Sequence, residues 1–208
     1  MHLSTVHAGA FDTDARQMLA AMLPALAMLA DLTERIPGLD NLPAEASAAL
    51  IGPGGIVDLP DRDRPPMLAD NEFRLLLSEF SRSGGGSLMI VWRVGRDWYR
   101  VGLSRQPSAG WPRSDLMLVH SRPARLPYGL SPRELDVLTR IAMGQSNQVI
   151  AHGLFVSPRT VHTHIEHILR KTGCSARAEA AALAMREHLL RPTPGGDALA
   201  SFVQHHPA

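Results

Sequence analysis

The chain has 208 residues, 45% hydrophobic and 20% charged, so it can bury the core of one large domain or two small ones. Its formal net charge of +1 excludes a polycationic arm, and any contact with nucleic acid must come from a local patch. The single cysteine, Cys174, excludes an intrachain disulfide and suits a reducing cytoplasm, with burial of the thiol favoured over an intermolecular bridge. Without a signal peptide or an uninterrupted apolar span, we predict a soluble, cytoplasmic protein.

The first predicted element is a helix within residues 1–40. Apolar residues recur at spacings of three and four from Met18 to Ile36, which is the period of a helix with one apolar face. Pro24 should kink this helix, and Pro37 should end it. The apolar face either packs on a sheet of its own chain or pairs with a second copy in a dimer, although about two and a half heptads are fewer than a coiled coil needs.

Residues 41–120 are expected to form a small antiparallel sheet with helices. A Gly-Pro-Gly-Gly turn at 52–55 separates two short apolar runs, which indicates a pair of strands. After a charged, proline-rich loop, helical spacing returns over 71–80 and ends at a glycine-rich stretch. Three further segments rich in β-branched and aromatic residues predict strands at 87–94, 97–104 and 116–120.

A linker at 121–129, marked by two prolines and a closing glycine, should precede the strongest pattern in the chain, residues 130–190. The motif Ser131-Pro132-Arg133-Glu134 places a serine at the N-cap, a proline at the first helical position and a glutamate three residues after the cap. These side chains can satisfy two backbone N–H groups at the start of a helix, and Gly144 should end that helix.

Two more helices are predicted after short connections. Ser146 should cap a short second helix. Ser157-Pro158 repeats the cap-then-proline signal at the start of a third helix, 158–172, which Gly173 should end. The segment therefore reads as three helices in close succession.

The third helix has one apolar and one polar face. Val161, Ile165 and Ile168 share the apolar face and should pack against Val149 and Ile150 of the second helix. The polar face carries Arg159, His162, Thr163, Glu166 and Arg170, with Lys171 beside it. In a major groove, such cations can neutralise phosphates, threonine can touch a base edge or a thymine methyl, and glutamate can accept from cytosine N4. By itself, however, a polar row of this kind is more often a solvated face.

In order and spacing, residues 130–190 resemble the LuxR/NarL family of DNA-binding domains. The resemblance rests on Leu130 to Glu134 with Val137 and Leu138, Gly144 to Asn147 with Ile150 and Ala151, Ser157 to Val161 with His164, and Ile168, Lys171, Gly173, Arg177 and Ala180. It implies four helices, with 158–172 as the recognition helix and a fourth helix, Ser175 to Leu190, that often pairs two copies on DNA.

The resemblance also assigns roles to single positions. His162, Thr163 and Glu166 would face bases, whereas Asn147, Thr160, Lys171 and Arg177 would lie near phosphates. Many relatives hold a basic or amide residue at the position of Glu166, so this carboxylate either reads a cytosine or points away from the DNA backbone.

Neither metal binding nor catalysis is predicted, and no cofactor is expected. His162, His164 and His167 scatter around the third helix, without a thiolate or carboxylate set that could complete a metal site. The sequence offers no set of nucleophile, base and orienting group, and Asp61 with Asp63 is interpreted as a solvated loop rather than an acid pair.

The region before the linker lacks the sequence features of two regulatory domains that are common in this family. A phospho-receiver needs paired acids after its first strand, an acceptor aspartate and a later lysine, but residues 1–120 contain no lysine. The aromatic residues do not reproduce the set of a homoserine-lactone sensor. What remains is weakly similar to a PAS or GAF sensor, and Phe11–Ile36 resembles the closing helix of a GAF domain. Trp92, Trp98 and Tyr99 either line a pocket or, as we favour, pack in the core or on the surface.

We therefore predict an α+β chain: a small antiparallel sheet with helices (PAS/GAF-like), then an all-α four-helix LuxR-type helix-turn-helix domain and a flexible tail at 191–208. The predicted function is sequence-specific, non-enzymatic transcriptional regulation on double-stranded DNA, by a homodimer joined through the N-terminal helix, the last helix or both. RNA polymerase and an unidentified small molecule are further candidate partners. Two alternatives are a promoter-binding region of a sigma factor, against which the strands at 87–120 argue, and an interaction module that no longer binds DNA.

Overall fold

The computed structural model describes residues 39, 41–52, 54–106, 116–193 and 202. The chain divides into two compact units, Met1–Leu42 and Pro43–Ala208, and the second holds both a sheet and a group of four helices. The helix predicted between Met18 and Ile36 lies outside the described residues.

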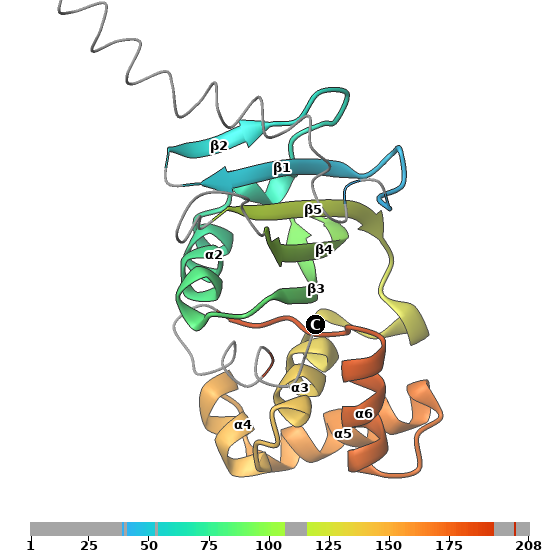
Figure 1. Ribbon diagram of the computed structural model, residues 1–208. Helices are drawn as coiled ribbons and strands as arrows, with labels where there is room; N and C mark the ends of the chain where they lie inside the picture. Colours follow the sequence, from blue (N-terminus) through green and yellow to red (C-terminus); the bar gives the residue numbers. More distant parts are fainter. Residues whose placement is uncertain (1–38, 40, 53, 107–115, 194–201, 203–208) are drawn as a thin grey trace, which may run out of the picture. The chain divides into compact units, whose positions relative to one another are not determined.

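Five antiparallel strands form one sheet in the order β2-β1-β5-β4-β3 (Figure 1). The predicted pair around the glycine-rich turn is a hairpin of β1 (Ser47–Gly52) and β2 (Gly55–Asp58). A second hairpin joins β3 (Ser87–Val94) to β4 (Asp97–Arg105). The central strand β5 (Met117–Ala124) pairs with β1 on one side and β4 on the other. The prediction of a small antiparallel sheet is confirmed.

Strand β5 is longer than the sequence suggests, because it continues to Ala124 inside the segment predicted as a linker. Proline normally argues against a central strand, since it lacks the N–H that a ladder needs. Pairing between β1 and β5 ends at Ser47 and Ser121, so Pro123 lies where β5 has become an edge strand with only β4, at Tyr99, beside it. A short 3₁₀ turn, η2 (Pro127–Gly129), then leads to the helices.

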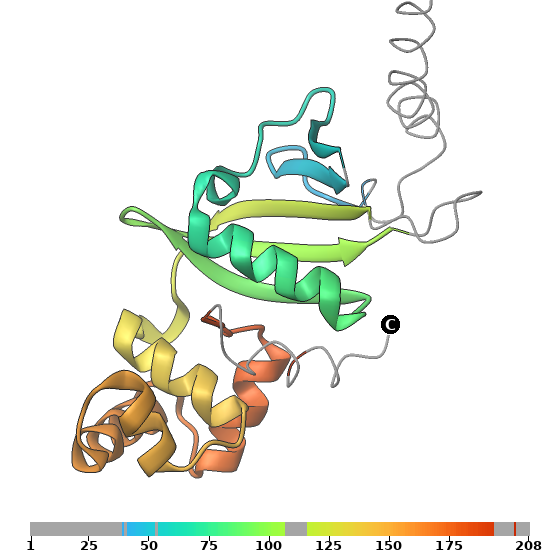
Figure 2. The same ribbon diagram turned by 90° about the vertical axis from the view of Figure 1, so that its left-hand side faces the viewer.

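Helix α2 (Asn71–Ser83) lies along one face of the sheet (Figure 2). It follows a 3₁₀ turn, η1 (Pro66–Ala69), starts where Asp70 accepts a hydrogen bond from the Glu72 amide, and ends at Gly84 with φ 74°. Its buried face, which consists of Phe73, Leu76, Leu77 and Phe80, joins the inward residues of the strands in one hydrophobic core.

The aromatic residues of the sheet serve packing. Trp92 is 4% exposed, meets Phe73 edge-on at 5.1 Å between ring centroids, and donates its indole N–H to Asp70 at 3.1 Å. Trp98 and Tyr99 are half-buried and pack against the same core. This arrangement agrees with the favoured interpretation of these residues as packing groups.

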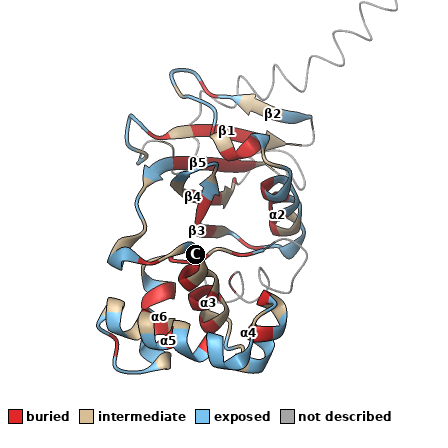
Figure 3. Cartoon of the chain, turned by 180° about the vertical axis from the view of Figure 1, so that it is seen from behind, coloured by how far each residue is buried: buried red, intermediate tan, exposed pale blue. Residues whose placement is uncertain are grey.

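The four C-terminal helices are α3 (Pro132–Ala142), α4 (Asn147–Leu154), α5 (Pro158–Thr172) and α6 (Arg177–Arg186). Figure 3 shows buried residues in red along β1 and β5 and on α3. Helix α6 is shorter than the predicted Ser175 to Leu190, because Glu187 leaves helical geometry and His188 adopts φ 54°.

The segment after α6 runs against the outer edge of β3. The Val91 N–H donates to the Leu190 carbonyl at 2.9 Å. The Arg191 guanidinium lies 5.6 Å from the centre of the Trp98 ring and 2.9 Å from the Asp136 carboxylate on α3. Arg191 therefore contacts the sheet and the helical domain at the same time. Phe202, within the segment predicted as a flexible tail, is 2% exposed and belongs to the core.

The second face of the sheet carries a close contact between Gly102 and His120, which lie opposite each other on β4 and β5. A Cβ on Gly102 would lie only 2.0 Å from His120 Nε2, so the imidazole occupies the space a side chain would need. Burial, together with the nearby charge of Arg122, lowers the pKa of His120.

We predict that Gly102→Ala lowers the free energy of unfolding by about 1–3 kcal/mol, because the methyl group forces the His120 ring out of its place. Urea unfolding of the full chain measures this change. In a His120→Ala background the space is vacant, and Gly102→Ala should be neutral or stabilise the protein by up to about 1 kcal/mol, because alanine restricts the unfolded chain more than glycine. Equal losses in both backgrounds would contradict the proposed crowding.

Candidate nucleic-acid interface

Helix α5 begins and ends where the sequence predicts. Ser157 is the N-cap and accepts a hydrogen bond from the Thr160 amide at 3.1 Å, Pro158 is the first helical residue, and Gly173 ends the helix with φ 72°. Because these signals fix both ends, the helix keeps one defined face toward its neighbours.

The apolar face of α5 is buried as expected. Val161, Ile165 and Ile168 are all less than 10% exposed, and Ile150 of α4 belongs to the same core. Val149 does not join them, because it is 53% exposed. The prediction that Val149 packs against α5 is therefore wrong, since position 149 falls on the outer side of the short helix α4.

The opposite face of α5 is open. All five predicted polar residues are exposed: Arg159, His162, Thr163, Glu166 and Arg170. A shallow hollow runs along the first half of this helix, lined by Ser157, Arg159, Thr160, Thr163, His164 and His167. The exposed residues can thus reach a ligand that approaches from this side.

Two side chains on the open face interact with each other. His162 Nε2 lies 3.4 Å from Glu166 Oε1, one helical turn away, and both side chains are more than 60% exposed. A surface contact of this kind contributes little to stability. The carboxylate and the imidazole are therefore available to a ligand.

Two arginines on α3 hold the C-terminal end of α4 in place. Arg133 donates to the Leu154 carbonyl, and Arg140 donates to the Gly153 carbonyl at 3.4 Å. A Cβ on residue 153 would lie 2.8 Å from an Arg140 nitrogen, so the glycine admits the guanidinium. The cations suit the negative end of the helix dipole, and they fix the turn from which α5 starts.

No local motif in the sequence predicts this role for Arg133 and Arg140. Their spacing of seven residues places them on one side of α3, and this shared side is the one indication of their role that the sequence contains. Their target carbonyls lie 13 to 21 residues away in the chain, where no local pattern can indicate them.

Lys171, predicted to lie near a phosphate, is engaged inside the domain. Its ammonium donates to Glu134 at 2.7 Å and to the Gly129 carbonyl at 2.9 Å. The Glu134 side chain is only 5% exposed and also accepts from the Ser131 amide at 2.7 Å. Burial raises the pKa of Glu134, but the hydrogen bonds from Lys171 and Ser131 outweigh burial and hold that pKa below its usual range.

Asn147 and Arg177, also predicted near phosphates, pair with each other. Arg177 donates to Asn147 Oδ1 at 2.9 Å and to the Gln145 carbonyl. This contact joins the start of α6 to the start of α4. Thr160, the fourth residue of that group, is exposed, and its hydroxyl lies 2.9 Å from the Ser157 hydroxyl.

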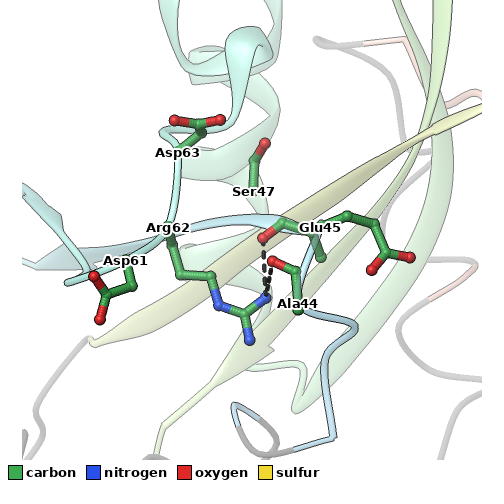
Figure 4. A pocket seen from close by; sticks show the side chains of 7 residues that line it. Ala44, Glu45, Ser47, Asp61, Arg62 and Asp63 are labelled. Carbon is green, nitrogen blue, oxygen red and sulfur yellow. Dashed lines mark hydrogen bonds between the residues drawn. The ribbon is translucent and has the colours of Figure 1, made fainter.

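A second hollow lies beside β1 in the sheet region (Figure 4). Arg62 reaches across it and donates to the carbonyls of Pro43, Ala44 and Ala46. Asp61 and Asp63 on its rim are exposed, in agreement with a solvated loop. Within the described residues, no three histidine, cysteine, aspartate or glutamate side chains are grouped so that they could hold a metal ion.

A short helix, a fixed turn and a capped helix with an open polar face define a helix-turn-helix domain, a class of DNA-binding structure. Residues 129–184 match the family described as bacterial regulatory proteins, luxR family. The probable transcriptional regulatory protein NarL of Mycobacterium tuberculosis is 33% identical over 183 residues, covering 85% of this chain and 79% of that protein. The transcriptional regulatory protein LiaR of Bacillus subtilis is 45% identical over 74 residues, 35% of each chain.

The chain belongs to the luxR family of bacterial regulatory proteins, and it is a transcriptional regulator with a DNA-binding helix-turn-helix domain. The family consists of transcription regulators rather than enzymes, as the sequence predicted. No helix in the described part of the chain is long and apolar enough to cross a membrane.

Solved structures similar to this chain include VqmA. VqmA bound to DPO is 16% identical, covers 65% of this chain and 70% of its own, and superposes with a TM-score of 0.32. A VqmA dimer of Vibrio cholerae, solved without target DNA, is 15% identical, covers 54% of this chain and 62% of its own, and gives a TM-score of 0.30.

We predict that Lys171→Met destabilises the protein by about 1–3 kcal/mol at pH 7, because it leaves the Glu134 carboxylate buried without its cation. Since the pKa of Glu134 is lowered in the folded state, the contribution of the pair is present at neutral pH and is lost as the pH falls through that pKa. The difference between wild type and variant should therefore shrink on acidification, which urea unfolding at a series of pH values measures.

Arg170→Met is the matched control for this prediction, because Arg170 is the exposed neighbour on the same helix. It should change the stability by less than about 0.5 kcal/mol. A Lys171→Met variant as stable as this control at neutral pH would show that the ion pair contributes nothing.

Proposed function

We propose that the exposed face of α5 lies in the major groove of double-stranded DNA and reads its sequence. The observation that carries this proposal is the open row of polar side chains on a helix whose apolar residues are buried on the other face. Arg159 and Arg170 supply positive charge for phosphates, and His162, Thr163 and Glu166 supply groups that hydrogen-bond base edges.

Asn147, Thr160, Lys171 and Arg177 would position the domain on the DNA backbone. The internal contacts of Lys171 and Arg177 leave some of the N–H groups of both side chains available to a phosphate. The Lys171 ammonium has three N–H groups and uses two, and the guanidinium of Arg177 has five and uses two. The same contacts restrict these side chains, so less entropy is lost when a phosphate binds.

We further propose that the regulator binds as a homodimer. Helix α6 offers a surface for pairing, because Ala178 and Ala182 expose small side chains one turn apart on its outer side. The helix predicted at 18–36 is the other candidate surface. RNA polymerase and a small ligand remain proposed partners.

The sheet region acts, in this proposal, as a regulatory unit other than a phospho-receiver. Two observations support the proposal: residues 1–120 contain no lysine, and the described strands all pair antiparallel. The contacts of Leu190 and Arg191 with β3 and Trp98 give this unit a physical connection to the DNA-binding helices.

Selection from a random DNA library at a stated salt concentration tests the DNA-binding proposal. We expect a palindromic site bound by two copies of the chain. The mass of the protein, measured free and bound to DNA, gives the number of copies. Glu166→Gln should change the preference at one base pair by about 1–3 kcal/mol, since an amide can donate where a carboxylate only accepts.

Arg170→Ala is the control for Glu166→Gln. It should weaken binding to all sequences alike and reduce the dependence on salt, as expected for a phosphate contact. Identical selected sequences for wild type and Glu166→Gln would refute a reading role for Glu166, and failure to enrich any sequence would favour an interaction module.

The connection through Arg191 gives a separate prediction. Arg191→Met removes the contacts with Trp98 and Asp136 and leaves the Val91–Leu190 hydrogen bond, so the two domains are held together less firmly and binding at two half-sites costs more entropy. We expect about 3- to 10-fold weaker binding to the palindrome and unchanged binding to a single half-site, measured by fluorescence anisotropy. Arg82→Met, an exposed charge near the end of α2, should change neither value. Equal affinities of Arg191→Met and wild type for the palindrome would rule out a positioning role.

A further inference from the structure

The turn between α4 and α5 carries an unusually exposed aromatic residue. The Phe155 side chain is 94% exposed, compared with 58% for Leu75 and 53% for Val149, the next most exposed large apolar residues in the described part of the chain. Soluble proteins bury most of their phenylalanine, so a ring almost entirely in water is costly unless something covers it.

The backbone at Phe155 adds to this cost. The residue ends α4 in the left-handed conformation, with φ 55° and ψ 45°, where glycine and asparagine are favoured and a bulky side chain is uncommon. Its amide donates to the His152 carbonyl at 3.2 Å, a bond that any residue but proline can form. The turn therefore requires the left-handed backbone and does not require the ring.

The neighbouring residues take over the packing of the turn. Leu154 is 9% exposed and belongs to the hydrophobic core, and half-buried Val156 packs against it. Phe155 lies between these two residues and is absent from the core. A conformationally disfavoured, exposed residue without a packing role points to a contact outside the chain.

The position of Phe155 indicates what that contact is. It lies two residues before Ser157, the N-cap of α5 and the first residue lining the hollow along that helix. In helix-turn-helix proteins, the N-terminal residues of the recognition helix are the ones that meet base edges. An α5 that enters the major groove by its N-terminal end would bring the turn that carries Phe155 close to the DNA.

We propose that Phe155 is a DNA-contacting residue, which packs its ring on the apolar groups at the edge of the major groove, the thymine methyls and deoxyribose carbons. This inference rests on the proposed role of α5 in DNA binding. It adds to that role an apolar contact beside the charged and polar ones, and such a contact is independent of salt because no counterion is released.

Phe155→Asn tests the proposal in the full chain. Asparagine suits the left-handed backbone, so the variant should melt at the same temperature as wild type or higher. Its affinity for the selected operator should fall by about 5- to 20-fold, as expected for exposing much of a phenyl ring again. The slope of affinity against salt should stay unchanged, because no phosphate contact is lost.

Leu75→Asn is the matched control, because Leu75 is an exposed apolar residue on α2 in the sheet region. It should leave DNA affinity unchanged. Phe155→Gly serves as a second variant that also fits the left-handed backbone, and it should lose as much affinity as Phe155→Asn.

Operators with deoxyuridine in place of thymine lack the thymine methyls, so they distinguish a contact with a methyl group from a contact with deoxyribose. If the ring meets a thymine methyl, wild type loses affinity on the substituted DNA and Phe155→Asn does not. If the ring meets deoxyribose, the loss caused by Phe155→Asn is the same on both DNAs. Either result supports a DNA contact.

Unchanged operator affinity for Phe155→Asn and Phe155→Gly would overturn the inference. Variants that bind DNA normally but fail in transcription with purified RNA polymerase would also overturn it and assign the ring to a protein partner. These results differ from a failure of the proposed function itself, in which wild type enriches no DNA sequence at all.

Discussion

The DNA-binding domain depends on one buried carboxylate. Glu134 stands at the start of α3 and accepts hydrogen bonds from the Ser131 amide and the Lys171 ammonium, and Lys171 also binds the Gly129 carbonyl. The three contacts tie the end of α5 to the start of α3 and to the connection from the sheet. Because a buried carboxylate is stable only when its partners are in place, the pair selects one arrangement of these helices. The open face of α5 is oriented by this arrangement.

Six cations of the domain fall into two groups. Arg133, Arg140, Lys171 and Arg177 donate to backbone carbonyls and buried polar groups that connect different helices. Arg159 and Arg170 stay exposed on α5. In a chain with a net charge of only +1, the first group connects the helices of the domain, and the second places positive charge on the open face of α5.

The sheet region is organised around α2 and Trp92, and it meets the helical domain through a short segment after α6. Strand β3 is an edge strand, and its Val91 N–H is satisfied by the Leu190 carbonyl. Pairing of this kind covers an edge that would otherwise be free to associate with another chain. Arg191 completes the contact because the flat side of its guanidinium can face the Trp98 ring while an N–H group at the edge of the guanidinium donates to Asp136.

The sequence by itself determined the helices and hairpins, because their signals are local: Ser131 and Ser157 cap with amides three residues away, and Gly173 needs only its own φ angle. It also placed the polar face of α5, since helical period alone separates Arg159 and Glu166 from Val161 and Ile165. Only the tertiary structure paired Lys171 with Glu134, 37 residues away, and Arg177 with Asn147, 30 away. It likewise decided that β5 continues to Ala124, that Val149 is exposed and that Phe202 is buried. Such contacts depend on how distant segments meet, and a local pattern carries no information about that.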